Sequence, residues 1–149
     1  MKNILLKILQ INPVEVQSVD RDHALRVATA TLLVEVVRAD FVVQESEQIR
    51  LRSILKQQFA LAEEELDALL EQAEQGADRM VSTQHVTRLL NQNFDHAMKV
   101  RVIEMMWELV YADNDKNHYE EHLIRQVADL LYISHGEFIR ARHRAEPDG

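Results

Sequence analysis

Residues 112–121, with the sequence ADNDKNHYEE, form a short acidic stretch between two strongly apolar segments. A related stretch, ADFVVQESE, occupies residues 39–47. In each of them an Asp follows an Ala and a Glu comes seven residues later, as Asp40 with Glu47 and Asp113 with Glu120. The two Asp residues lie 73 positions (113 − 40) apart, and the same offset pairs Glu35 with Glu108, Val37 with Val110, and Glu64 with Glu137. Such self-similarity predicts two packed structural units, with repeat halves at about 20–76 and 82–145.

Proline and glycine are rare in the chain, which favours helices throughout. The prolines are Pro13 and Pro147, and the glycines are Gly76, Gly136 and Gly149. No proline therefore interrupts residues 14–146, and sheet proteins usually need more turn residues than this. The 149 residues suit one domain with a substantial core. The prediction is an all-α fold: a single domain over residues 1–149, built as a compact bundle of seven to eight helices with an internal pseudo-twofold repeat.

Apolar spacing and capping residues place the individual helices. The first is expected to start at Asp20 or Asp22 and to end near Arg38. Its two apolar stripes predict a central, buried helix, although Val34, Val36 and Val37 would also suit a strand. Further helices are expected at 45–59, at 63–75 with Gly76 at its end, at 83–93, from a cap at Asp95 to about 111, after the second acidic stretch, and from a Ser134–Glu137 capping box onward. Glu35 and Glu108 share a register and are expected to face solvent.

Composition narrows the functional classes. The formal net charge of −8 disfavours nucleic-acid binding and favours cations or a basic protein partner. The absence of cysteine excludes disulfides, thiolate metal sites and thiol nucleophiles, and it suits the cytoplasm. Residues 1–11 (MKNILLKILQI) are shorter than the roughly 20 apolar residues that a membrane span needs, and no signal-cleavage pattern follows them. They are expected to dock on the body as an amphipathic turn, with membrane-surface or partner contact as the alternative.

The acidic stretches are the candidate site. An Asp at the C-terminal end of a helix opposes the helix dipole at a cost of about 0.3–1 kcal/mol, so Asp40 and Asp113 need a compensating partner. Backbone amides at the next helix start are one such partner. The capping-box spacing of Asn117 with Glu120, and of Gln44 with Glu47, supports them. The other partner is a divalent cation.

Alternating oxygen donors in the second stretch suggest a calcium-type site for Ca²⁺, Mg²⁺ or Mn²⁺. Asp113, Asp115 and Asn117 alternate like the first ligands of a calcium loop. An EF-hand is excluded because His118 stands where that loop needs Gly and Ile124 where it needs Glu. The site must therefore take further carboxylates, from Glu120, Glu121 or the first stretch. The first stretch is poorer, since Phe41 and Val42 leave it the carboxylates of Asp40, Glu45 and Glu47, so the second is expected to bind more strongly.

The pentapeptide His118-Tyr119-Glu120-Glu121-His122 also matches the H-x-x-E-H zinc motif of inverted metalloproteases. Two His four residues apart can hold zinc on one helix face. However, the match falls early in its helix, Glu120 suits a cap, and no Gly-rich or Ser-His-Asp pattern accompanies it. We interpret it as adventitious zinc or nickel binding at most, and we assign no catalytic residue.

Three segments resemble the tellurite-resistance protein B (TerB-like) family over nearly the whole chain. They are residues 32–40 (LLVEVVRAD), residues 111–113 (YAD), and residues 120–131 (EEHLIRQVADLL) with Ile133-Ser134-His135 after them. The family usually has Ala-Asp-Gly in both loops, and Phe41 and Asn114 replace that Gly here. Asn tolerates a left-handed backbone far better than Phe, which weakens the ligand role of the first loop.

The resemblance implies a compact all-helical domain with a pseudo-twofold repeat, similar to the N-terminal domain of a membrane-anchored DnaJ-type co-chaperone. It also implies that the acidic loops bind a metal or a charged partner. Three functions follow, in order of preference. The first is a non-enzymatic cytoplasmic module that binds a divalent cation and is linked to metal or tellurite stress. The second is a metal-free module that docks a basic protein through its acidic face, and the third is a metal-dependent enzyme.

Overall fold

The computed structural model describes residues 13–39, 45–78, 82–112 and 118–147, and within these ranges every regular secondary-structure element is a helix. The prediction of an all-α bundle is confirmed, and the strand alternative at Val34–Val37 is wrong. The seven described helices are α2 (Pro13–Arg38), α3 (Glu45–Phe59), α4 (Glu63–Asp78), α5 (Thr83–Asn93), α6 (His96–Ala112), α7 (His118–Leu130) and α8 (His135–Ala145).

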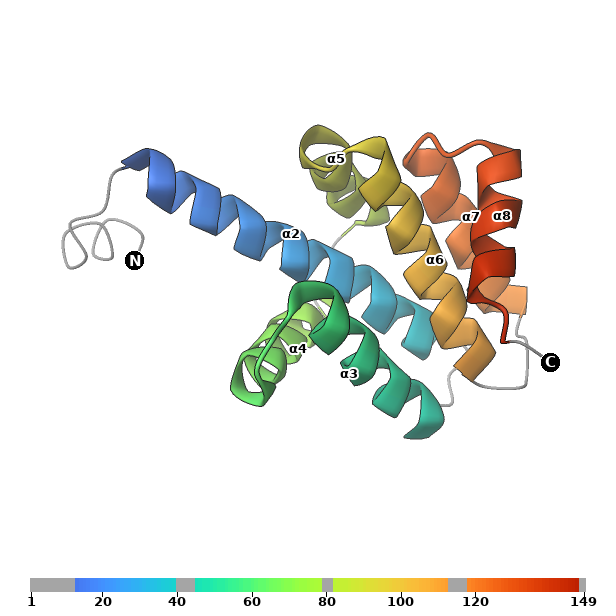
Figure 1. Cartoon of the computed structure of the whole chain (residues 1–149), viewed down its shortest axis with the longest axis horizontal. Helices are drawn as coiled ribbons and strands as arrows, with labels where there is room; N and C mark the ends of the chain where they lie inside the picture. Colours follow the sequence, from blue (N-terminus) through green and yellow to red (C-terminus); the bar gives the residue numbers. More distant parts are fainter. Residues whose placement is uncertain (1–12, 40–44, 79–81, 113–117, 148–149) are drawn as a thin grey trace.

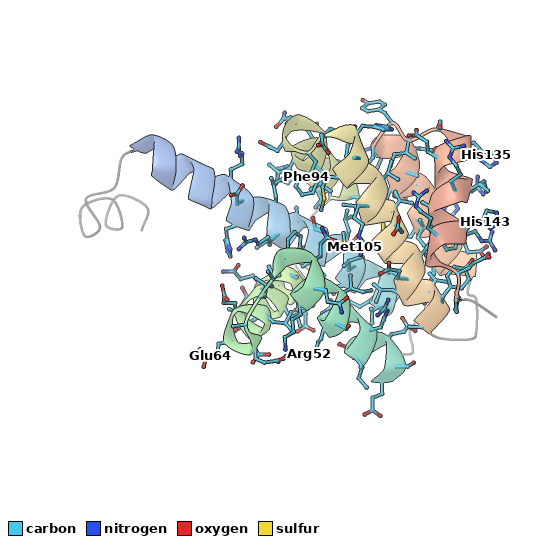
Figure 2. The ribbon with its side chains drawn as sticks, viewed as in Figure 1. Arg52, Glu64, Phe94, Met105, His135 and His143 are labelled. Atoms are coloured by element: carbon cyan, nitrogen blue, oxygen red, sulfur yellow. The ribbon has the colours of Figure 1, made fainter. Side chains whose placement is uncertain are left out.

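Two long helices, α2 and α6, form the centre of the bundle (Figure 1). Helices α3 and α4 pack on α2, while α7 and α8 pack on α6. Leu32, Leu33 and Val36 of α2 are fully buried, as are Met105 and Met106 of α6. Figure 2 shows Met105 between the helices. The prediction that the first long helix is central is therefore confirmed.

Helix α2 begins earlier than predicted. It starts at Pro13, a favoured first position because proline lacks only an N–H that would have no partner there. Asp20 and Asp22 lie inside it and do not begin it. Asp22 corresponds to Asp95 at the repeat offset, and Asp95 does cap α6, accepting from the Met98 N–H at 2.8 Å. Asp95 can begin a helix because the extended backbone of Phe94 separates α5 from α6. Asp22 cannot, because α2 continues past it without a break.

Gly76 was expected to end its helix, but α4 continues to Asp78. The glycine serves packing: a Cβ atom at this position would lie 3.3 Å from the Thr31 hydroxyl oxygen of α2. The missing side chain lets α4 approach α2 closely. The last residues of the two helices also meet, since Arg38 Nη1 of α2 lies 2.7 Å from Asp78 Oδ1 of α4.

The second half repeats the first with one residue fewer between the start of the helix and the bend that follows it, from 118 to 132 in place of 45 to 60. Ala60 after α3 and Tyr132 after α7 both have a left-handed backbone, with φ of 52° and 59°. After each, an N–H returns to a carbonyl five residues earlier, from Leu61 to Lys56 and from Ile133 to Ala128. These residues correspond at an offset of 72, not 73.

The shorter offset changes one predicted pair. The Glu65 carboxylate accepts from the Ala62 N–H at 3.0 Å, and the Glu137 carboxylate accepts from the Ser134 N–H at 3.1 Å. Glu65 is therefore the structural counterpart of Glu137, and the sequence match with Glu64 is wrong. Glu64 points outward at the edge of the bundle (Figure 2).

The predicted capping box at the start of α8 is confirmed and also ties α8 to α6. Ser134 Oγ accepts from the Glu137 N–H at 3.2 Å while Glu137 accepts from Ser134. The other carboxylate oxygen of Glu137 meets His96 Nε2, at the first residue of α6, at 2.5 Å. The hydrogen bond with His96, followed by those from Ser134, lowers the pKa of Glu137 from 4.5 to about 2.

This pKa predicts how stability depends on pH. Because folding lowers the pKa of Glu137, its contribution is complete above about pH 4.5 and is lost as the pH falls toward 2. We expect Glu137→Gln to lower the melting temperature at pH 6. The melting temperature of this variant should also depend less on pH between about 4.5 and 2 than that of wild type. Thermal melts at stepped pH check this against Glu64→Gln, which removes an exposed carboxylate outside any capping box. Parallel acid profiles for Glu137→Gln and wild type would contradict it.

Candidate functional site

The helix ends that border both acidic stretches lie at one end of the molecule (Figure 1). These are the last turns of α2 and α6 and the first turns of α3 and α7. Side-chain contacts link these ends: Arg50 of α3 lies 3.7 Å from Glu108 of α6, and Arg142 of α8 contacts both Glu121 of α7, at 3.8 Å, and Tyr111 of α6, at 2.9 Å. The described borders of the two stretches thus share one neighbourhood, which we call the acidic end.

Two of the predicted site residues are buried glutamates at equivalent positions. Glu47 lies in the first turn of α3 and Glu120 in the first turn of α7, and the exposed fraction of each is 0%. Removing a carboxylate from water is costly unless charge or hydrogen bonds compensate it. A helix N-terminus supplies part of that compensation through its dipole and amides. The same buried position is therefore occupied by a glutamate in both halves of the repeat.

Four other predicted site residues, Asp40, Asp113, Asp115 and Asn117, lie outside the described residues. Glu45, the remaining carboxylate of the first stretch, is exposed at the start of α3. His122 of the H-x-x-E-H match is exposed on α7, and the side chain of His118 lies outside the described part. Among the side chains that the structure describes, no three His, Asp or Glu are grouped as a metal site would require.

Glu121, the seventh predicted site residue, faces a guanidinium. Arg142 approaches its carboxylate at 3.8 Å. The same guanidinium covers the Trp107 ring, 5.0 Å from the ring centroid, and donates from Nε to the Tyr111 oxygen at 2.9 Å. Tyr111 in turn donates to Glu146 at 3.0 Å. The hydrogen bond with Tyr111 is the main reason that the pKa of Arg142 is raised, so Arg142 is a fixed positive charge beside Glu121.

A second set of charges links α3, α6 and α8. Arg101 donates to Glu104 and Glu108 of its own helix, each at 2.8 Å. Arg144 of α8 also pairs with Glu104, at 2.9 Å. The Glu108 side chain is only 14% exposed, so the expectation that it faces solvent is wrong. Its counterpart Glu35 is also partly buried, and burial raises its pKa against the opposing effect of Arg38.

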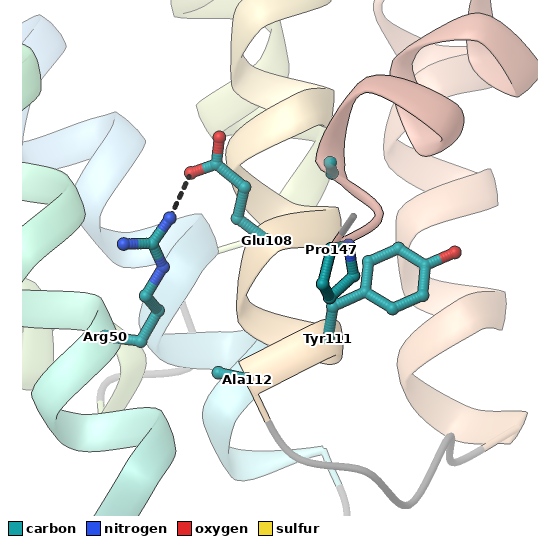
Figure 3. A pocket seen from close by; sticks show the side chains of 6 residues that line it. Arg50, Glu108, Tyr111, Ala112 and Pro147 are labelled. Carbon is teal, nitrogen blue, oxygen red and sulfur yellow. Dashed lines mark ion pairs between the residues drawn. The ribbon is translucent and has the colours of Figure 1, made fainter. Parts of the chain in front are cut away.

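A hollow of about 260 Å³ opens at the acidic end between α3, α6 and the end of α8 (Figure 3). Arg50 and Glu108 lie on one side of it, and the ring of Tyr111 with Pro147 lies on the other. Ala112, the last residue of α6, also lines it and directly precedes the second acidic stretch. The side chains of Arg50 and Glu108 therefore give the hollow one positive and one negative charge.

Comparison with known proteins assigns this chain to a family. Residues 26–143 match the model of a family described as Tellurite resistance protein TerB. The chain belongs to the TerB family. No curated protein and no solved structure matches the chain. The matched range contains α3 to α7 whole, the second half of α2 and most of α8, so both acidic stretches belong to the TerB domain, and the predicted resemblance is confirmed.

TerB domains are in general non-catalytic helical domains, which agrees with the all-α fold seen here. The similarity to a DnaJ-type co-chaperone stays a prediction. No helix in the described ranges has the length and apolar character needed to cross a membrane.

The sequence did not point to Arg142 or Arg50 as parts of this TerB acidic end. The run Arg140–Arg144 indicates a favourable basic helix end, but Arg142 differs from its neighbours in packing on Trp107. Arg50 pairs with Glu108 across 58 residues of sequence (108 − 50). No local pattern contains such contacts, because they depend on how α3 and α8 pack against α6.

Proposed function

We propose that this TerB domain is a non-enzymatic cytoplasmic module that binds a divalent cation, Ca²⁺, Mg²⁺ or Mn²⁺, through its two acidic bends. The observation that supports it most is the matched burial of Glu47 and Glu120 at the acidic end. Each is seven residues from an Asp in the sequence, Asp40 or Asp113. Hard cations bind carboxylate oxygens at about 2.3–2.6 Å and compensate several negative charges at once.

The donors available fit such an ion. In addition to the two glutamates, the second stretch supplies Asp113, Asp115 and Asn117, all with oxygen ligands and none with sulfur. A bound cation would offset the unfavourable position of an Asp after a helix C-terminus. Glu121 already faces Arg142, so it is a weaker candidate ligand than Glu120. The family's name suggests a link to metal or tellurite stress, which we include in the proposal.

The test is metal-dependent stability in wild type and in Asp113→Asn/Asp115→Asn. A ligand that prefers the folded state raises the melting temperature with its concentration. We expect millimolar Ca²⁺ or Mn²⁺ to raise the melting temperature of the wild type and to leave that of the double variant unchanged. Glu64→Gln, an exposed carboxylate on α4, serves as the control and should respond like wild type. A wild type that melts identically with chelator and with each metal would contradict the proposal.

A metal-free docking module is the second candidate, and the carboxylates that the acidic end leaves open to solvent favour it. Glu45 is exposed at the start of α3, and the Glu121 side chain remains 34% exposed beside Arg142. In that case added metal would leave the melting temperature unchanged. A lysine- and arginine-rich peptide would then bind the wild type and not the Asp113→Asn/Asp115→Asn variant.

A further inference from the structure

A polar groove lies between α5 and the end of α7, far along α7 from Glu120. Its volume is about 350 Å³, which is within the range of small-ligand and peptide side-chain sites. Gln84, Arg88 and Gln92 line it from α5, and Leu130 and Tyr132 line it from the other side. No acidic residue is among those that line it.

Tyr132 has a conformation and an exposure that the fold does not require. Its φ of 59° is the left-handed region, which a bulky residue rarely adopts. The side chain is nonetheless 78% exposed, so packing does not explain the ring. The repeat provides an internal comparison: Ala60 makes the same bend after α3 with φ of 52° and no ring. The bend therefore needs no aromatic side chain at this position.

Two cations beside the groove have no carboxylate partner within 4.0 Å among the described residues: Arg88 and Lys99. Arg88 is exposed on α5. Lys99 Nζ lies 3.2 Å from the neutral Asn91 Oδ1 and 5.9 Å from the centre of the Tyr132 ring. In a chain of net charge −8, both charges remain available to an acidic ligand.

The edge of the groove is held in place. Asn91 Nδ2 donates to the Leu130 carbonyl at 2.9 Å, which ties α5 to the last turn of α7. The Tyr132 N–H returns to the Asp129 carbonyl at 3.1 Å, and the Ile133 N–H returns to Ala128 at 3.0 Å. The aromatic ring is thus attached to a backbone that hydrogen bonds already hold, so binding of a ligand does not have to order this backbone.

We propose that this groove binds an acidic peptide segment of a partner protein. Tyr132 provides the aromatic surface on which the peptide packs, and Arg88 with Lys99 binds its carboxylates. The amides of Gln84 and Gln92, which line the groove, would bond its backbone. Tyrosine and arginine are the residue types that contribute most to binding in such contacts, and a charged hydrogen bond to a carboxylate is stronger than a neutral one. This surface is separate from the acidic end and does not depend on metal.

The test uses the full chain and two blocked octapeptides, one of alternating Glu and Ala and one of alternating Gln and Ala. Amide ¹H–¹⁵N spectra are followed during titration in the presence of a chelator. We expect the Glu peptide to shift signals from residues 84–92 and 130–133, and to bind at least tenfold more tightly than the Gln peptide. Tyr132→Ala and Arg88→Gln/Lys99→Gln should each weaken binding of the Glu peptide at least tenfold.

Arg140→Gln, which removes an exposed arginine of α8 outside the groove, should bind the Glu peptide like wild type. Tyr132→Ala should fold normally, because Ala60 shows that alanine makes this bend, and its melting temperature checks this. The proposal is overturned if the Glu peptide causes no shifts at millimolar concentration, if the Gln peptide binds equally well, or if Tyr132→Ala retains wild-type affinity.

Discussion

Trp107→Ala is expected to destabilise the protein by about 3–5 kcal/mol, the usual cost of removing a large aromatic side chain from a core. Trp107 is 1% exposed and lies between α6 and α8. Its ring meets Phe138 edge-on at 5.5 Å between centroids and is covered by the Arg142 guanidinium at 5.0 Å. Because small domains are stable by only about 5–15 kcal/mol, this change removes a large fraction of the total.

Urea unfolding followed by far-ultraviolet circular dichroism measures the effect, since the variant lacks the only tryptophan. Tyr132→Ala is the control: it also removes an aromatic ring, but an exposed one, and should change the free energy of unfolding by no more than about 0.5 kcal/mol. A loss below about 1 kcal/mol in Trp107→Ala would show that the contact of α6 with α8 does not depend on this ring.

Glu47→Gln/Glu120→Gln is expected to abolish stabilisation by divalent metal. If the acidic end binds the ion as proposed, wild type should gain about 2.7 kcal/mol at a metal concentration one hundred times the dissociation constant. Gln keeps the size of the buried side chain and removes its charge, so the double variant should fold but gain nothing from metal. Urea unfolding with saturating Mn²⁺ and with chelator measures both quantities.

Glu64→Gln/Glu71→Gln is the matched control, because it removes two exposed carboxylates of α4 and leaves the acidic end intact. It should gain from metal as wild type does. The single variants separate the two bends. The second stretch has more oxygen donors, so Glu120→Gln should lose more of the gain than Glu47→Gln. Equal gains in the Glu47→Gln/Glu120→Gln variant and in wild type would remove both glutamates from the proposed site.

Most of the fold could be predicted from local sequence. Helical spacing and the scarcity of Pro and Gly predicted the helices, and the ends marked by Asp95 and by the Ser134–Glu137 capping box are confirmed. The wrong predictions concern residues that suit a helix end in the local sequence but lie inside a helix in the structure. Asp22 has the sequence of a cap, but the backbone of α2 continues past it. Gly76 has the sequence of a helix end, but its role is close packing against Thr31.

The candidate site was less predictable, because its contacts join residues that are distant in the sequence. The seven-residue spacing picked out Glu47 and Glu120, and the structure buries both. The spacing could not reveal that Glu121 meets Arg142 or that Glu108 is shared by Arg50 and Arg101. The offset itself also shifts from 73 to 72 within α3, so a fixed repeat distance wrongly paired Glu64 with Glu137.

The most direct test of the proposed cation site is the metal content of purified wild type. The protein is dialysed against buffer with a small excess of Ca²⁺, Mg²⁺ and Mn²⁺, freed of unbound ions, and measured by elemental mass spectrometry. We expect one or two divalent ions per chain, and fewer than 0.1 per chain in Asp113→Asn/Asp115→Asn. A wild type that retains no stoichiometric ion under these conditions would contradict the account.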